Sequence, residues 1–254
     1  MTDNSADEIL RHYAEADEAS RLRTGWFQLE QARTQELILR HIPPAPATVL
    51  DIGGGAGAYA CWLAARGYQV HLIDPVLRHV EQACTASAKQ PQHPLASAVV
   101  GDARQLQEAD QTVDAILSLG PIYHLTERQD RLTALREAHR VLRSGGPIWV
   151  AGISRFASLL DSLSGGFFDR PEFVPILDRD LADGQHRNPT DNLTYFTNAF
   201  FHRPDELAAE VSEAGFTGVE LVPIEGPGLV GSGFCPPVEP SPAARAVTRL
   251  AAEG

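Results

Sequence analysis

The segment that decides the fold is Val49-Leu50-Asp51-Ile52-Gly53-Gly54-Gly55-Ala56-Gly57. Its first residues form a short apolar run typical of a buried strand, and the glycines then let the chain turn into a helix that we predict at 58–66. Glycine is required because a side chain would keep a ligand from lying against the bare backbone. The segment therefore predicts a strand, a ligand-binding loop and a helix in direct succession.

Strand-like and helical segments alternate on the C-terminal side of this loop. Strands separated by helices of this length form right-handed crossovers, so the pattern predicts a doubly wound, mostly parallel α/β sheet. The strands are predicted at 48–52, 69–73, 96–100, 113–119 and 148–153 and the helices at 58–66, 76–88 and 126–142.

The flanking segments differ from this core. Residues 5–41 have helical spacing, with Thr24-Gly25 dividing two helices, and several prolines end the second helix. Residues 154–203 break the alternation, contain a strand-like run at 193–201, and are expected to be an insertion that covers the carboxyl edge of the sheet. A helix at 204–214, a strand at 218–224 and a last helix at 242–252 follow. We therefore divide the chain into an N-terminal helical lid (1–44), a ligand-binding α/β core (45–153), an insertion that caps the substrate (154–203) and a C-terminal part (204–254).

Composition excludes several function classes. The 254 residues include 21 Lys+Arg and 33 Asp+Glu, a net charge of −12, and 43% hydrophobic residues. So acidic a surface repels phosphate backbones and anionic lipids, and neither nucleic acid nor membrane is an expected partner. The three widely spaced cysteines indicate neither a zinc site nor a disulfide scaffold. The polar, acidic N-terminus and the absence of a long apolar run lead us to expect a soluble cytoplasmic protein.

Three aspartates stand where a nucleoside ligand would need them. Asp51 precedes the glycine loop, where a carboxylate can receive an ammonium group. Asp74 ends the second strand, about twenty residues on, the distance at which an acid holds ribose hydroxyls. Asp102 ends the third strand, where an acid can accept a hydrogen bond from an adenine amino group. Gly53, Gly55 and Ala58 also satisfy a GxGxxA dinucleotide pattern, so a nicotinamide ligand stays open at this point.

The ordered set of segments resembles the class I S-adenosylmethionine-dependent methyltransferases over about residues 45–225. The resemblance is carried by LDIGGGAG (50–57), LIDP (72–75), GDARQL (101–106), DAILSLGPIYHL (114–125) and LREAHRVLRSGGPIWVAGISR (135–155). Residues 119–132 are similar to an uncharacterised or natural-product subgroup. The chain departs from the family after Ile224: the sheets of the family end in an antiparallel strand pair, and here the sequence predicts no last strand. We expect that strand to be missing or replaced.

The resemblance implies S-adenosyl-L-methionine as the cofactor and assigns its contacts. The glycines Gly53, Gly55 and Gly57 would approach its methionyl part, and Asp51 would face its ammonium group together with the backbone of Leu119. An arginine before the loop would pair with its carboxylate, and we expect Arg33 in that role because arginine binds carboxylates with two parallel hydrogen bonds. The nucleoside contacts are expected from Asp74 and Pro75 at the ribose and from Asp102, Ala103 and Arg104 at the adenine.

Candidates for the methyl acceptor follow the fourth strand directly. His124 could act as a general base with a pKa near neutrality, and Tyr123 could align the acceptor with the methyl group. Tyr13 and Arg23 are candidates on the lid. Tyr195 and His202 are candidates on the insertion, although its aromatic residues can equally form a small core of their own. The histidines show no metal-ligand spacing, so no metal site is predicted.

The implied function is methyl transfer to a small organic molecule, with secondary metabolism as one setting. The alternatives are a nicotinamide-dependent oxidoreductase and a catalytically silent cofactor-binding protein. Against the oxidoreductase stand Asp102 and the GPIYHL segment at 120–125, for which a dehydrogenase has no use. The sequence indicates neither the acceptor atom nor the oligomeric state.

Overall fold

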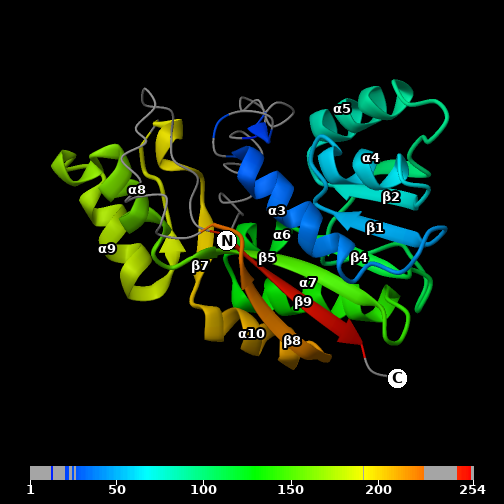
Figure 1. Ribbon diagram of the computed structural model, residues 1–254. Coiled ribbons are helices and arrows are strands. Elements are labelled where there is room, and N and C mark those ends of the chain that lie inside the picture. The colour runs from blue at the N-terminus through cyan, green and yellow to red at the C-terminus, as the bar shows by residue number, and fades with distance from the viewer. Residues whose placement is uncertain are drawn as a thin grey trace.

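A computed structural model shows the arrangement of the chain (Figure 1). It describes residues 27–190, 192–225 and 245–252, together with Tyr13, Arg21, Leu22 and Gly25. Most of the predicted N-terminal helices, including Arg23, and the Gly/Pro-rich stretch after residue 225 lie outside the described residues.

A nine-stranded sheet forms the centre of the described chain. Its first strands run parallel in the order β3-β2-β1-β4-β5. The carboxyl end of β1 is thus flanked by those of β2 and β4, the position at which doubly wound sheets bind ligands. The bounds of these strands are β1 Thr48–Ile52, β2 Gln69–Asp74, β3 Ser97–Val100, β4 Ala115–Ser118 and β5 Pro147–Ser154.

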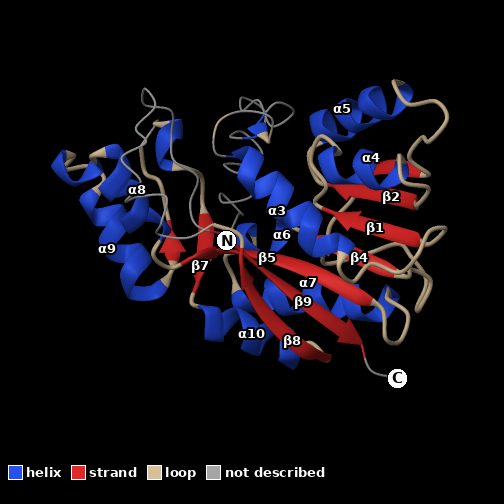
Figure 2. Cartoon of the chain, viewed as in Figure 1, coloured by secondary structure: helices blue, strands red, loops and turns tan. Residues whose placement is uncertain are grey.

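Helices cover both faces of this sheet (Figure 2). One face carries α3 Phe27–Leu39, α4 Ala58–Ala64 and α5 Leu77–Ala88. The other carries α7 Arg128–Val141 and α10 Pro204–Glu213. The expectation of a doubly wound, mostly parallel α/β fold is therefore confirmed.

The core follows the two-residue alternation of the strands. In β1, Val49 packs into the cluster beneath α3, α4 and α5, whereas Leu50 packs into the cluster beneath α7 and α10. In β5, Trp149 and Val150 divide in the same way. A strand with apolar residues on both faces is buried on both faces, which explains the uninterrupted apolar runs that predicted these strands.

A short helix and the loop after it, both between β4 and β5, position the site. The fourth strand ends at Ser118, and Leu119-Gly120 leads into the short helix α6 Pro121–His124, which the sequence analysis did not predict. Proline is favoured in the first turn of a helix because its missing N–H would have no partner there. The loop 125–127 then joins α6 to α7.

The insertion after β5 has a small core of its own. It comprises α8 Ala157–Gly165, η1 Phe167–Asp169, α9 Val174–Asp183, β6 Gln185–His186, η2 Leu193–Tyr195 and β7 Ala199–His202. Residues Phe167, Phe173, Ile176, Leu177 and Tyr195 form one buried cluster. The antiparallel hairpin β6–β7 joins the sheet through β7, which pairs with the last residues of β5 at Ile153 and Ser154.

The C-terminal part corrects one prediction. The strand β8 Phe216–Pro223 pairs with β9 Arg245–Ala252, and β9 runs antiparallel to β5 from Pro147 to Ile153. The predicted helix at 242–252 is wrong, and so is the expectation that the last strand is missing or replaced. The alanines of this segment favour a helix, but pairing with two strands distant in sequence overrides that local preference.

Candidate active site

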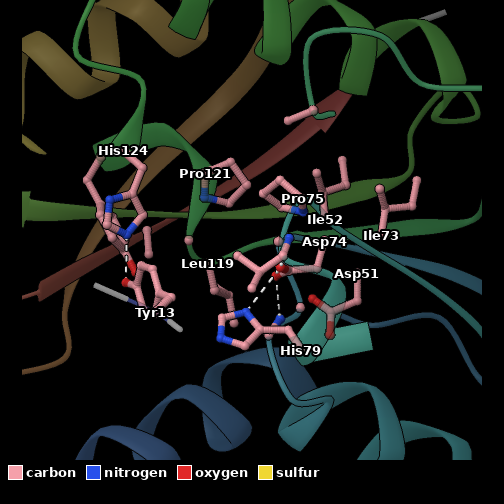
Figure 3. A pocket seen from close by; sticks show the side chains of 18 of the residues that line it. Tyr13, Asp51, Ile52, Ile73, Asp74, Pro75, His79, Leu119, Pro121 and His124 are labelled. Atoms are coloured by element: carbon pink, nitrogen blue, oxygen red, sulfur yellow. Dashed lines mark hydrogen bonds and ion pairs between the residues drawn. The ribbon is translucent and has the colours of Figure 1, made fainter. Parts of the chain in front are cut away.

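A cavity of about 280 Å³ opens at the carboxyl ends of β1, β2 and β4 (Figure 3). Ligand pockets commonly measure about 300–1,000 Å³, so the cavity is near the lower end of that range. The structure brings most of the candidate residues from the sequence analysis to its wall. These are Tyr13, Asp51, Gly53, Gly55, Asp74, Pro75, Asp102, Ala103, Arg104, Leu119, Tyr123 and His124.

The glycine loop forms the floor of the cavity with its backbone. The N–H of Gly53 donates to the carbonyl of Ile73 at 2.7 Å, and its φ is 69°, a left-handed conformation that favours glycine. A Cβ at Gly53 would lie 2.7 Å from the ring of Pro121, closer than side chains approach one another. The turn thus needs glycine both for its conformation and for the contact with α6.

Asp74 ties the loop to the second strand. Its Oδ2 accepts a hydrogen bond from the N–H of Gly55 at 2.9 Å, and its Oδ1 accepts one from the N–H of Val76 at 2.9 Å. His79 Nδ1 lies 3.1 Å from the same Oδ1. The residue is 4% exposed. These bonds fix the orientation of the carboxylate at the cavity wall.

Asp51 is a buried acid without a matching cation among the described residues. It is 2% exposed, and no described residue hydrogen-bonds its Oδ2. Burial, with the nearby charge of Asp74, raises its pKa to about 7, and a backbone hydrogen bond from Ala60 offsets only part of this rise. A positively charged ligand group in the cavity would restore its ionised form.

Asp102 lies at the open end of the site. Its side chain is 46% exposed and forms an ion pair with Arg104, whose Nη2 and Nε donate to its carboxylate at 2.7 and 3.0 Å. These hydrogen bonds lower the pKa of Asp102. The Nη1 of Arg104 also donates to Asp130 at 2.9 Å, so one guanidinium joins the end of β3 to the first turn of α7.

Aromatic rings gather on the opposite side of the cavity. The hydroxyl of Tyr13 lies 2.7 Å from Nε2 of His124, and the two rings meet edge to face at 5.2 Å between centroids. Tyr123 lies 4.6 Å and Phe196 5.8 Å from the His124 ring. Figure 3 shows Tyr13 and His124 together on this side, with Pro121 and Leu119 between them and the two buried aspartates.

A buried arginine fixes the loop that follows His124. Arg131 is 1% exposed, and its Nη1 donates to the carbonyls of Leu125 and Thr126, both at 2.9 Å. Its Nε and Nη2 donate to the two carboxylate oxygens of Glu210 on α10 at 2.8 and 2.7 Å. Burial opposes ionisation of Glu210, but the hydrogen bonds from Arg131 and His202 outweigh it and hold the pKa at about 2. The loop beside the cavity is therefore attached to a helix distant in sequence.

Four candidates are not brought to the cavity wall. Arg33 is absent from the cavity wall, and its guanidinium pairs with Glu36 on the next turn of α3 at 2.6 Å, where both side chains are partly exposed. Gly57 precedes α4 with a φ of 82°, where it completes the turn.

The two candidates from the insertion also lie elsewhere. Tyr195 is 2% exposed within the aromatic core of the insertion, and its hydroxyl donates to Glu172 at 2.9 Å. His202 is 3% exposed, burial lowers its pKa, and its Nε2 lies 3.4 Å from Glu210. The alternative that the insertion packs its own aromatic core describes Tyr195.

Several cavity residues were not singled out from the sequence. Arg21 donates to Glu30 at 2.8 Å, and Glu30, Thr34 and His79 line the wall although they are at most 5% exposed. The helical spacing of the sequence could have identified Glu30 and Thr34. They share the buried face of α3 with Leu37 and Ile38, and polar residues on an apolar face indicate a ligand or an internal partner.

In the described part of the chain, no group of three or more His, Cys, Asp or Glu side chains could hold a metal ion. None of its helices is both long enough and apolar enough to span a membrane.

Comparisons with known proteins agree with this geometry. A family model described as a methyltransferase domain matches residues 49–146, which include the glycine loop, all three aspartates and α6. The ubiquinone/menaquinone biosynthesis C-methyltransferase of Rubrivivax gelatinosus is 32% identical over 197 residues, 76% of this chain and 72% of that protein. The chain belongs to the class I S-adenosylmethionine-dependent methyltransferases.

Other relatives of this methyltransferase share less of its length or sequence. A malonyl-acyl-carrier-protein O-methyltransferase of Methylococcus capsulatus is 34% identical over 113 residues, so the match spans only 38% of that protein. The structure of the 1,6-didemethyltoxoflavin N1-methyltransferase of Burkholderia thailandensis superposes with a TM-score of 0.63 over 98% of this chain and 89% of that chain. At 18% identity, that likeness shows the fold.

The residues present suit S-adenosylmethionine, the methyl donor of this methyltransferase. Its ammonium group would meet the buried Oδ2 of Asp51, which has no described partner. Its hydroxyls and adenine would meet Asp74 and the exposed Asp102, both on the cavity wall. Family membership also decides against the nicotinamide ligand that the GxGxxA pattern left open.

Proposed function

We propose that this methyltransferase transfers the methyl group to a small organic molecule, in secondary metabolism, with His124 as general base. The observation that carries the proposal is a group of rings at the cavity: Tyr13, Tyr123 and His124 line its wall, and Phe196 packs against the His124 ring. Aromatic rings pack well against a planar organic acceptor. The name of the Burkholderia methyltransferase gives 1,6-didemethyltoxoflavin as its acceptor, and that of the Rubrivivax relative places it in ubiquinone and menaquinone biosynthesis. The net charge of −12 argues against nucleic acid as the acceptor.

The cofactor residues are proposed as follows. Asp51, Asp74 and Asp102 bind the ammonium group, the ribose and the adenine, while Gly53 and Gly55 present bare backbone. Pro75 and Ala103 pack against the nucleoside, and the backbone of Leu119 faces the ammonium group. Arg21, which lines the cavity, replaces Arg33 as the candidate for the cofactor carboxylate.

The chemistry of the acceptor side follows from one hydrogen bond. Bound S-adenosylmethionine supplies an electrophilic methyl group on sulfur. An acceptor atom that carries a proton must lose it when it receives the methyl group. The Tyr13 hydroxyl, bonded to Nε2 of His124, can take that proton while its own proton moves to the ring. Tyr123 holds the His124 ring in place.

The experiment is a product assay with the complete chain. The protein is incubated with S-adenosylmethionine and a panel of phenols, hydroxyquinones and aromatic amines, and S-adenosylhomocysteine is measured. Acceptor-dependent product with members of this panel, and none with tRNA or a basic peptide, is the expected result. Turnover only with the macromolecules would contradict the proposal. Calorimetry with S-adenosylhomocysteine and NADH separately tests the cofactor.

A further inference from the structure

His79 is a buried residue of the cavity wall to which the proposed function assigns no role. It lies in the first turn of α5 and is 4% exposed. Its Nδ1 is 3.1 Å from Oδ1 of Asp74. Figure 3 shows the imidazole beneath Asp74, with its second nitrogen on the side of the ring turned away from the carboxylate.

The partners of Asp74 determine where His79 carries a proton. Both carboxylate oxygens already accept backbone N–H groups, from Gly55 and from Val76. Such an oxygen is an acceptor, so the hydrogen of the bond to His79 must be on Nδ1. The outer nitrogen, Nε2, is therefore the acceptor of a neutral ring or a second donor of a protonated ring.

Nε2 of His79 is buried and has no hydrogen-bond partner among the described residues. A buried polar atom in this state has lost its contact with water without gaining a hydrogen bond, which is unfavourable. The ring of Tyr13 meets the imidazole edge to face at 5.4 Å between centroids. Since His79 lines the cavity, a bound molecule can supply the missing partner.

We propose that Nε2 of His79 binds a ribose hydroxyl of the nucleoside cofactor, beside the hydroxyl held by Asp74. A hydroxyl both donates and accepts, so it can pair with Nε2 in either protonation state. His79 would then be a binding residue through one nitrogen and a positioning residue for Asp74 through the other. This inference rests on the proposed contact between Asp74 and the ribose.

Two substitutions separate the nitrogens. Asparagine places its amide near the position of Nδ1, so His79→Asn keeps a donor for Asp74 and removes the outer group. Glutamine reaches the position of Nε2, so His79→Gln keeps the outer group and loses the donor to Asp74. His93→Gln is the matched control, because His93 is an exposed residue of the loop before β3.

Calorimetry measures S-adenosylhomocysteine, adenosine, 2′-deoxyadenosine and 3′-deoxyadenosine against each variant. We expect His79→Asn to weaken S-adenosylhomocysteine and adenosine about tenfold, the loss of one hydrogen bond to a buried group. It should leave unchanged the affinity for the deoxynucleoside that lacks the hydroxyl bound by His79. His79→Gln should retain the discrimination between adenosine and that deoxynucleoside, and His93→Gln should match the unsubstituted protein.

Two outcomes would overturn the inference while leaving the proposed function intact. In one, His79→Asn binds all four ligands like the unsubstituted protein. In the other, it weakens adenosine and both deoxynucleosides equally, which assigns His79 to positioning alone. Failure of the unsubstituted protein to bind S-adenosylhomocysteine would instead count against the proposed function. If a variant does not fold, the ¹⁵N resonance of Nε2 in the unsubstituted protein must still shift when S-adenosylhomocysteine is added.

Discussion

The two sides of the cavity differ in how far apart in the sequence their bonded residues lie. On the side that we propose for the nucleoside, Asp74 bonds Val76 two residues away and Gly55 nineteen residues away. On the side that we propose for the acceptor, His124 bonds Tyr13 across 111 positions, and Arg131 bonds Glu210 across 79. The nucleoside side is therefore a local property of consecutive strand–loop–helix units. The acceptor side exists only when distant segments are assembled.

Replacement of His124 should show the largest difference between the two sides. His124→Ala should lower turnover by about 10²–10⁴-fold for an acceptor that loses a proton, the range for a lost general base. Affinity for S-adenosylhomocysteine, measured by calorimetry, should change by less than about twofold. Near-normal turnover in this variant would remove the base role, while the methyltransferase assignment would remain.

The buried pair behind the acceptor side should control stability. Arg131→Met removes the two shortest hydrogen bonds of the buried Glu210 carboxylate and frees the carbonyls of Leu125 and Thr126. We expect the free energy of unfolding in urea to fall by about 3–5 kcal/mol. The matched control is Arg136→Met on the same helix, whose exposed pair with Glu213 should be worth about 0–1 kcal/mol. Equal losses in the two variants would contradict this account.

Replacement of Asp74 tests the nucleoside side. Asp74→Asn keeps the size of the side chain but weakens its acceptor bonds, and we expect S-adenosylhomocysteine to bind less tightly by about 1–3 kcal/mol. The affinity loss should be accompanied by no change in the pH dependence of turnover, because His124 lies on the other side. Unchanged binding would show that the ribose is held elsewhere.

Asp51 should make the stability of the ligand-free protein depend on pH. Its pKa is raised from 3.8 to about 7, so the folded chain retains a proton that the unfolded chain releases. The stability that protonated Asp51 contributes to the folded state is fully present below about pH 4 and is lost as pH rises through about 7. Asparagine carries no titrating proton. The gain in unfolding free energy of Asp51→Asn over the unsubstituted protein should therefore be larger at pH 8 than at pH 5, by at least about 1 kcal/mol. Urea unfolding at both values measures this difference, with the exposed Asp178→Asn as control.

Arg33 provides the smallest expected effect. Because its guanidinium pairs with Glu36 outside the cavity, Arg33→Ala should change the affinity for S-adenosylhomocysteine by less than about 0.5 kcal/mol. A loss above about 1 kcal/mol in calorimetry would restore the sequence-based interpretation and imply that α3 turns when the cofactor binds.

The sequence predicted the position of a residue correctly where that position depends on its own strand and loop. The run Thr48–Ile52 was predicted with its observed bounds, and Asp51, Asp74 and Asp102 reach the cavity because parallel strands end at one edge of the sheet. It failed for 242–252, whose local preference for a helix is overridden by pairing with β5 and β8. It also failed for Tyr195, since an aromatic residue in an insertion fits a core and a binding site equally well.

The sequence by itself determined the sheet, the glycine loop and the acids beside it, because each follows from short-range spacing and the geometry of parallel strands. Only the tertiary structure decided that Tyr13 meets His124 and that Arg131 holds the loop after it. It also decided that His79 contacts Asp74 through Nδ1, while its Nε2 has no partner among the described residues. Side-chain hydrogen bonds extend only about 3 Å. Which distant residues come within that distance is therefore fixed by packing, and no spacing in the sequence records it.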